Sequence, residues 1–263
     1  MGPRGIALDR EGNLYIATSD KTTNTLPWHD RVRKVDQNGI ITTVAGTAGR
    51  GYNGDGMPAT QALLFSPQDI VVDADGNLYI ADMDNHRIRK VDRSGKITTF
   101  AGTGSPGYSG EGVDATQAML KRPYSVALDG SGKLYISEPD NLRVRVVLPN
   151  GTITTVAGNG SSGYYRDGVS AIDANIGPLG LALDGTDHLY IASDVRVLKV
   201  FKPFFAPSSF LNPGERLVPD GGIGYVLAPN GDHRATVDLA SGQALFTFGY
   251  DGGLPRQSSV DLS

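Results

Sequence analysis

The chain carries an internal repeat with a step of 56 residues. The pattern Val/Phe-Ala-Gly begins at Val44, Phe100 and Val156, so each copy stands 56 residues after the previous one. A second apolar pattern, Leu-Tyr-Ile followed by Ala or Ser, begins at residues 14, 78, 134 and 189. A fixed period near 50 with several short apolar runs per unit is typical of modular repeat proteins. We therefore expect an array of four similar units.

Each unit is expected to form a four-stranded antiparallel sheet. Short runs rich in β-branched and aromatic residues lie at 70–72, 78–81, 87–91 and 97–101 of the second unit. Turn-forming clusters separate them, at residues 73–77 and 92–95. Apolar residues do not recur at helical spacing for more than a turn or two, so no long helix is expected.

The fold class is predicted to be all-β, and the architecture a β-propeller. A four-stranded sheet cannot bury both of its faces alone, and radial repetition around an axis solves this problem while leaving only short edges. The first strand of each sheet would line the axis and the fourth would lie at the rim. The competing interpretation is a linear stack of independent sheets.

The residues from Asp82 to Val91 and from Ala101 to Gly112 resemble NHL repeats, notably the long-looped bacterial kind. The resemblance covers residues 2 to about 200 and repeats in register. It implies a propeller fold and a binding habit but no single chemistry. Most NHL propellers are recognition or scaffold modules, and a minority are metal-dependent enzymes.

Composition excludes several classes of site. The chain of 263 residues has a net charge of −4 and no cysteine, so it offers no disulfide, zinc–thiolate site or thiol nucleophile. Nucleic-acid binding is not expected without a basic block, and Arg87 to Lys90 are interpreted as the solvated side of the third strand. The sequence shows no signal-peptide pattern and no apolar run of membrane-spanning length.

The chain is expected to divide into four propeller units (1–200), a proline-rich linker (201–214) and a β-strand tail (215–263). Strands are expected in the tail at 223–227, 234–238 and 244–251. Residues 230–234 and 247–252 resemble the start of the RHS or YD-repeat region that follows NHL propellers in teneurin-like proteins. This resemblance implies a fragment of a larger polypeptide, secreted or on the cell surface and bacterial, that carries no signal peptide within this chain.

Ring closure has two alternatives. The fourth unit lacks a recognisable fourth strand, so either the tail supplies a fifth blade and the missing strand, or two chains complete one another. Unpaired sheet edges favour the second alternative. A homo-oligomer, most simply a dimer, is therefore expected.

Strand parity places the long connections on one face of the propeller. The segment after the second strand and the glycine-rich segment after the fourth would both emerge there. An insertion of eight residues in the first unit, which includes residues 21–28, would join them. Function in a rigid scaffold concentrates on such loops.

Three acidic residues are candidates for a metal centre at the axis. Asp69 and Ser125 replace the glycine that the first and fourth units carry at the entry of the first strand. Asp82 and Glu138 end the second strand of their units. Six-bladed lactonases and phosphotriesterases hold a divalent cation at this place with oxygen ligands. Asp69 and Glu138 would then be catalytic. The alternative for each residue is a structural role in turns or at the rim.

Two histidines are candidate ligands for the same cation. His29 and His86 lie at nearly equivalent loop positions, and Asp82 and Asp84 could complete the set. Zn²⁺, Ca²⁺ or Mn²⁺ would suit such ligands.

Aromatic residues of the long loops are candidates for ligand binding. Tyr52, Tyr108 and Tyr164 recur in the glycine-rich loops, and Trp28 lies in the insertion. They could stack on a small molecule, a glycan or a peptide. The alternative is that each tyrosine fixes its own loop against the neighbouring blade.

Two functions thus remain open at this stage. The first is a non-catalytic recognition or scaffold module beside an RHS-like region. The second is a metal-dependent hydrolase of phosphotriesters, lactones or other esters.

Overall fold

The computed structural model describes residues 2–19, 29–163, 169–186, 188–193 and 196–200, and beyond these the backbone of five strands between 216 and 259. The chain divides into two compact units, Met1–Val200 and Phe201–Ser263. Each unit is described by itself.

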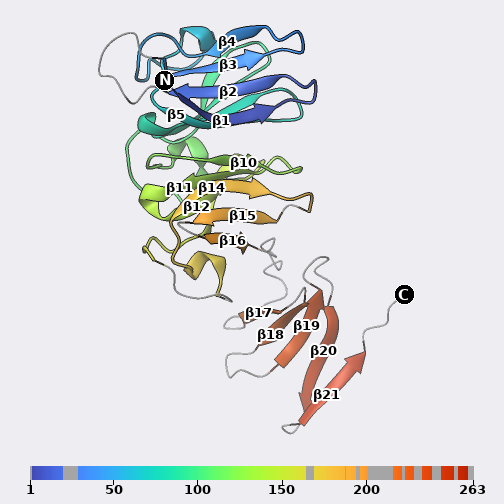
Figure 1. Ribbon diagram of the computed structural model, residues 1–263. Coiled ribbons are helices and arrows are strands. Elements are labelled where there is room, and N and C mark those ends of the chain that lie inside the picture. The colour runs from blue at the N-terminus through green and yellow to red at the C-terminus, as the bar shows by residue number, and fades with distance from the viewer. Residues whose placement is uncertain are drawn as a thin grey trace. The chain divides into compact units, whose positions relative to one another are not determined.

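The first unit consists of four successive antiparallel sheets, which we call blades 1 to 4 (Figure 1). The strands that make up the blades follow the chain order. They are β1 (Gly2–Leu8), β2 (Leu14–Ser19), β3 (Arg31–Val35) and β4 (Ile41–Ala45) in blade 1; β5 (Pro67–Val72), β6 (Leu78–Asp82), β7 (Arg87–Val91) and β8 (Ile97–Ala101) in blade 2; β10 (Val126–Leu128), β11 (Leu134–Glu138), β12 (Arg143–Val147) and β13 (Thr152–Ala157) in blade 3; and β14 (Pro178–Leu183), β15 (Leu189–Ser193) and β16 (Arg196–Val200) in blade 4.

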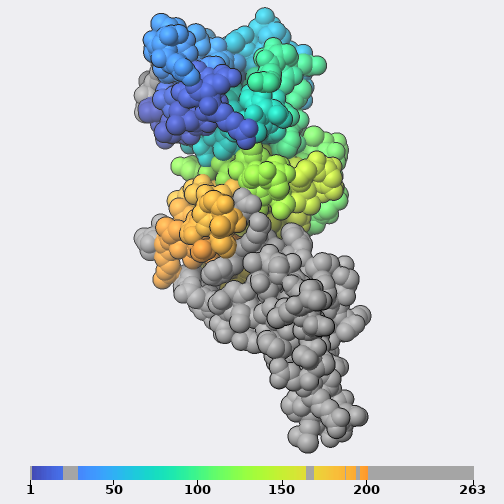
Figure 2. Space-filling model, turned by 90° about the vertical axis from the view of Figure 1, so that its right-hand side faces the viewer, coloured from blue at the N-terminus to red at the C-terminus, as the bar shows by residue number. Residues whose placement is uncertain are grey.

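The blades pack through their first strands, as expected for a β-propeller. β5 contacts both β1 and β10, and β10 contacts β14. Figure 2, which looks onto the side of the short turns, shows the blades following one another from blue to orange. The hydrophobic core lies between the blades. Between blades 1 and 2, Ala17 and Val32 pack with Ile70, Ile80 and Ile97. The predicted all-β propeller class is confirmed.

Blade 2 shows why local pattern determines these strands. Its four strands cover the four runs predicted from the sequence, because β-branched residues and turn clusters alternate there without ambiguity. In the turn before β6, the Asp73 carboxylate accepts backbone N–H bonds from Asp75 (2.9 Å) and Asn77 (2.8 Å). This closes the hairpin.

The repeated Ala-Gly pair has a steric cause. Gly102 follows β8 with φ +95°, and a side chain there would overlap the carbonyl oxygen of His86. Gly46 and Gly158 are in the same position against Asp30 and Leu142. Only glycine combines positive φ with so close an approach of two backbones.

The glycine-rich loops after β4 and β8 run along the rim of the next blade instead of staying on one face. The backbone N–H of Ala59 donates to Gly95 O, and that of Ala115 donates to Gly151 O, in the short turns at the other end of the blades. β9 (Val113–Asp114) also pairs with the outer strand β13. The expectation that all long loops share one face is therefore wrong, and the outer edges of blades 2 and 3 are covered.

In the part of the chain that the structure describes, the helical segments are five single turns of 3-10 helix, each three residues long. They are η1 (Ala59–Gln61), η2 (Met83–Asn85), η3 (Ala115–Gln117), η4 (Pro139–Asn141) and η5 (Ala171–Asp173). Among the described residues, no helix is long and apolar enough to cross a membrane.

The described strands of the second unit form a five-stranded antiparallel sheet. Its strands are β17 (Arg216–Asp220), β18 (Ile223–Leu227), β19 (His233–Asp238), β20 (Ala244–Asp251) and β21 (Leu254–Ser259). The three predicted strands are present, and β17 and β21 are two further strands that the sequence analysis did not predict. They contain Pro219 and Pro255. Both are edge strands, where proline is tolerated. The described strands of the tail pair with one another, and blade 4 has three described strands.

Candidate functional site on the loop side of the blades

We call the end of the blades where β6 and β11 terminate the loop side. Two acidic residues end these strands, and both are fully buried. Asp82 accepts the backbone N–H of Phe65 (2.7 Å) and the side-chain amide of Asn85 (2.7 Å). Glu138 accepts the equivalent bonds from Lys121 (2.7 Å) and Asn141 (2.8 Å). Each carboxylate thus joins the incoming loop to the 3-10 turn that follows its strand.

A buried arginine lies beside each of these carboxylates. Arg89 Nη1 is 3.8 Å from the Asp82 carboxylate, and Arg145 Nη1 is 3.9 Å from that of Glu138. The Nη2 atoms donate to Gly54 O (2.9 Å) and Gly110 O (2.7 Å) in the preceding blade's glycine-rich loop. Residues 87–90, in strand β7, were expected to be solvated. This expectation is wrong for Arg89, because the glycine-rich loop that contains Gly54 covers its side chain.

The same loop supplies a second carboxylate to each arginine. Asp55 lies 2.8 Å from Arg89 Nη2, and Glu111 lies 3.2 Å from Arg145 Nη2. Each of these two acids is followed by a glycine, Gly56 or Gly112, and the two pairs stand 56 residues apart. Threonine and tyrosine hydrogen bonds lower the pKa of Glu111 to about 2 against the opposing effect of its partial burial. Glu111 is therefore ionised at neutral pH, which suits its place beside Arg145.

Burial raises the pKa of Asp82 and of Glu138 to about 7. A carboxyl group of this kind can serve as a general acid when it reaches a substrate. Both side chains are instead sealed from solvent by the loops that they bind. Their geometry suits holding the loops rather than contacting a ligand.

Asp69 lies on the first strand of blade 2 and bonds to blade 3. Its Oδ2 accepts the hydroxyl of Ser125 (2.6 Å) and the backbone N–H of Val126 (3.0 Å). Ser125 Oγ in turn accepts the N–H of Leu181 in blade 4 (3.1 Å). Blade 1 has Gly5 at the equivalent position, where a side chain would overlap Asp69. Asp69 and Ser125, the two residues that replace glycine at this position, thus form hydrogen bonds between neighbouring blades.

The two described loop tyrosines stack on arginines of the next blade. Tyr52 lies 3.8 Å from the guanidinium carbon of Arg87, and Tyr108 lies 3.9 Å from that of Arg143. Both rings remain partly exposed at the rim. This is the geometry expected if each tyrosine fixes its own loop. Tyr164 lies outside the described residues, as does Trp28.

A half-exposed charged cluster joins blades 2 and 3 on the loop side. Arg122 Nε lies 3.0 Å from Asp84 Oδ1, and its Nη1 lies 3.7 Å from Asp140 Oδ2. The backbone N–H of Arg122 donates to Nδ1 of His86 (3.1 Å). Burial is the largest influence on His86 and lowers its pKa. Because the ring nitrogen accepts a hydrogen bond, His86 is neutral in this arrangement.

The predicted metal ligands are not brought together. His86 and Asp84 face Arg122, whereas Asp82 is buried against Phe65 and Asn85. His29 lies beside Arg31, with Nδ1 3.4 Å from its guanidinium. Among the side chains that the structure describes in the first unit, no group of three or more His, Asp or Glu residues could hold a metal ion. The divalent cation thus stays a prediction that these residues do not support.

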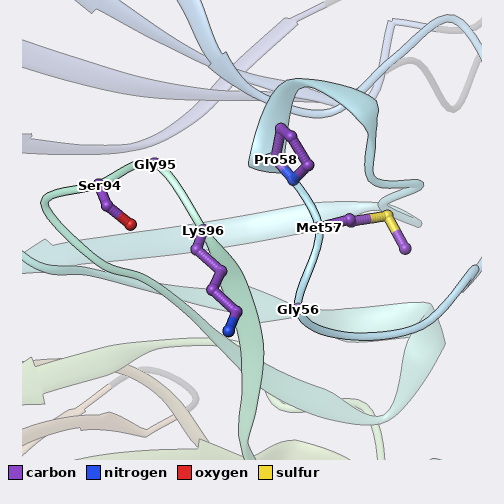
Figure 3. Close-up of a pocket in the computed structure, with 6 residues that line it drawn as sticks. All are labelled: Gly56, Met57, Pro58, Ser94, Gly95 and Lys96. Carbon is purple, nitrogen blue, oxygen red and sulfur yellow. The ribbon is translucent and has the colours of Figure 1, made fainter.

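One hollow of about 200 Å³ lies at the rim of blade 2 (Figure 3). It is lined by the glycine-rich loop at Gly56, Met57 and Pro58 and by the short turn at Ser94, Gly95 and Lys96. The hollow is shallow and lies away from the loop-side residues. It marks the place where the loop crosses the outer strand.

Sequence reasoning missed the buried arginines and their loop acids. A signal for them exists, because Asp55 precedes Arg89 by 34 residues and Glu111 precedes Arg145 by the same interval. In blade 4 the positions of Asp82 and Arg89 are held by Ser193 and Leu198, as the strand register shows. Blade 4 therefore lacks both the carboxylate and the arginine of this ion pair.

The sequence of this chain is similar to that of proteins with NHL repeats. The Teneurin NHL domain family matches residues 47–109. The repeats are NHL repeats. The chain is 30% identical to mouse Teneurin-3 over 279 residues and 30% identical to chicken Teneurin-1 over 278. Each alignment covers 95% of this chain but 10% of the relative, so the chain spans about a tenth of their length.

A solved structure shares the fold of the NHL repeats. It is a crystal structure of a protein of unknown function from Bacteroides thetaiotaomicron, with a TM-score of 0.56 and 19% sequence identity. The match covers 73% of this chain and 44% of that one. At this identity the similarity concerns the fold alone.

Proposed function

We propose that this chain is a recognition or scaffold module of a larger, teneurin-like protein at the cell surface. The observation that carries the proposal is the 30% identity to Teneurin-3 across 95% of the chain. The second unit makes up more than 5% of the chain, so this alignment must extend into it. That extension supports the proposed RHS-like continuation. A bacterial source stays a prediction.

The polar residues of the loop side support a binding role over a catalytic one. Asp82, Glu138, Arg89 and Arg145 are buried and hold the loops in place. The charged cluster at Arg122 is accessible, since the side chain of Arg122 is 41% exposed and that of Asp140 is 37% exposed. Rigid, partly exposed charges of both signs suit recognition of a protein partner. We therefore assign the partner surface to this cluster.

The test is a binding experiment with the chain displayed on beads. The beads are presented to a panel of purified cell-surface and secreted protein domains, and Arg122→Glu is compared with the unchanged chain. We expect saturable binding that Arg122→Glu weakens at least about tenfold, because a like charge then faces the partner. Arg93→Glu makes the same charge change in an exposed short turn at the other end of blade 2 and should bind normally.

Two results would contradict the proposal. Binding to no member of the panel, or equal loss with both variants, would remove the assignment to the loop side. Metal content and EDTA-sensitive hydrolysis of lactone and phosphotriester substrates should be measured on the same preparation. Turnover that depends on a bound metal would favour the hydrolase, which no observation on the described residues supports.

A further inference from the structure

Blades 2 and 3 each bury an arginine whose hydrogen-bonding groups are only partly used. In blade 2, Nη2 of Arg89 donates to the glycine-rich loop, but Nε and Nη1 have no hydrogen-bond partner among the described residues. In blade 3, Nε of Arg145 and Oε2 of Glu138 likewise have no hydrogen-bond partner within the described part of the chain. All four atoms are buried. A buried polar group without a partner costs free energy, so such groups in folded proteins normally have one.

Each arginine faces the carboxylate at the end of the neighbouring strand across a gap. Nη1 of Arg89 lies 3.8 Å from Oδ2 of Asp82, and Nη1 of Arg145 lies 3.9 Å from Oε2 of Glu138. Both gaps are too wide for a hydrogen bond. A direct bond between a guanidinium and a carboxylate closes to about 2.7–2.9 Å. The two groups are therefore neighbours without being in contact.

The two gaps are nearly equal although the two acids differ in length. Glutamate has one more methylene group than aspartate, yet Glu138 comes no closer to its arginine than Asp82 does. The other oxygen of each carboxylate accepts a backbone N–H from the incoming loop, at Phe65 or Lys121. A small molecule of fixed size between the carboxylate and the guanidinium would produce this constant separation.

We propose that blades 2 and 3 each hold one internal water molecule between the strand-end carboxylate and the buried arginine. A water oxygen about 2.8 Å from each of the two groups spans such a gap. Water suits both neighbours, because it accepts an N–H bond from the guanidinium and donates an O–H bond to the carboxylate. Internal waters with two or more polar partners of this kind are part of many folded proteins.

The charges of the site disfavour an ion as its occupant. An anion such as chloride would lie against the carboxylate, and a metal cation would lie against the guanidinium. A neutral molecule that both donates and accepts meets neither repulsion. The site is buried and lies apart from the exposed cluster at Arg122, so it does not depend on the proposed partner surface.

Blade 4 provides a comparison within the same chain. The positions of Asp82 and Arg89 are held there by Ser193 and Leu198. The hydroxyl of Ser193 accepts the backbone N–H of Gly177 (2.9 Å), and the leucine side chain has no polar atom. Blade 4 thus offers neither charged group, and no equivalent water is expected in it.

The test is a crystal structure of the whole chain at a resolution that shows ordered solvent. We expect one solvent peak in each of blades 2 and 3, about 2.8 Å from an arginine nitrogen and from the second carboxylate oxygen. A direct guanidinium–carboxylate contact with no peak between the groups would overturn the proposal. A chloride or metal ion in place of the water would also overturn it.

Two variants assign the water to the charged pair. Asp82→Ser/Arg89→Leu gives blade 2 the pair found in blade 4, and it should lose the water of blade 2 while blade 3 keeps its own. Asp55→Asn changes the other acid beside Arg89 and should keep the water, because the inner carboxylate and guanidinium remain. Loss of the water in this control would contradict the assignment to the inner pair.

A measurement in solution complements the crystal structures. Oxygen-17 relaxation dispersion counts long-lived internal waters, and it should find one fewer in the double variant than in Asp55→Asn. Equal counts in the two variants would overturn the assignment. The structure of the unchanged chain decides the proposal even if the double variant does not fold.

Discussion

The hydroxyl of Ser125 donates a 2.6 Å hydrogen bond to the carboxylate of Asp69, across the junction of blades 2 and 3. The two residues occupy equivalent positions one repeat apart. Together with the bond from the backbone N–H of Val126 to the same carboxylate (3.0 Å), it forms a direct polar contact between the two blades.

Asp69→Ala should lower the free energy of unfolding by about 1–3 kcal/mol, because the N–H of Val126 and the hydroxyl of Ser125 both lose their acceptor. Ser125→Ala should cost less, since Val126 keeps its bond. Denaturant titration of the single and double variants measures the coupling between them. Asp75→Ala, in an exposed turn of the same blade, is the control and should change stability by less than about 0.5 kcal/mol. Additive effects of the two variants would contradict a direct bond.

Stability should fall as the pH rises from about 5 to 8. Burial raises the folded-state pKa of Asp82 and Glu138 to about 7, above the value of about 4 in the unfolded chain. The folded state therefore binds more protons within this window, and the stabilisation is lost as the pH passes the folded pKa. Calorimetry of the unchanged chain and of the Asp82→Asn/Glu138→Gln double variant provides the comparison. The double variant should depend less on pH, and a stability that rises with pH in the unchanged chain would refute this prediction.

Removing one member of a buried ion pair should cost more than removing both. Arg145→Met leaves the Glu138 carboxylate buried without its cation and should destabilise the fold by about 3–5 kcal/mol. Adding Glu138→Gln should recover part of that loss, because glutamine can still accept the N–H of Lys121 without a charge. Equilibrium unfolding of the two single variants and the double variant measures this. An equal or greater loss in the double variant would show that charge is not the cause.

Tyr108 should contribute more through its ring than through its hydroxyl. Tyr108→Ala removes the stack on Arg143 and should cost about 1–3 kcal/mol, because cation–π attraction and packing are lost together. Tyr108→Phe keeps the stack and loses the bond to Glu111 (2.8 Å), which should cost about 1 kcal/mol. The melting temperatures of both variants, measured by thermal unfolding, show whether the ring or the hydroxyl contributes more to stability. If Phe and Ala are equally harmful, the hydroxyl dominates.

The strands were predictable because they depend on local pattern. The runs at 70–72 and 97–101 alternate with turn residues, and each became part of β5 or β8. The burial of Arg89 was not predictable from its own neighbourhood, because the residues that cover it lie in a loop about 34 positions earlier. From the sequence alone, a polar residue in a strand is expected to face solvent, because a segment far away in the chain that covers it cannot be seen. The roles of the candidate acids depended on the same non-local contacts.

Part of that non-local information was nevertheless present in the repeat. Asp69 and Ser125 depart from glycine at one shared position, and the structure shows them bonded to each other. When two neighbouring units both replace the residue that the repeat usually carries at one position, the two replacing side chains are candidates for a direct contact. The coordinated change to Ser193 and Leu198 in blade 4 is a second example.

The path of the glycine-rich loops makes the array directional. Blade 2 receives its outer cover from the segment that precedes it, at Gly56 and Ala59, and blade 3 receives its own at Gly112 and Ala115. A duplication that copied only the strands of one sheet would leave the new sheet's rim bare. The unit that must be duplicated as a whole is therefore not the four-stranded blade alone. It consists of a glycine-rich loop and the four strands that follow it.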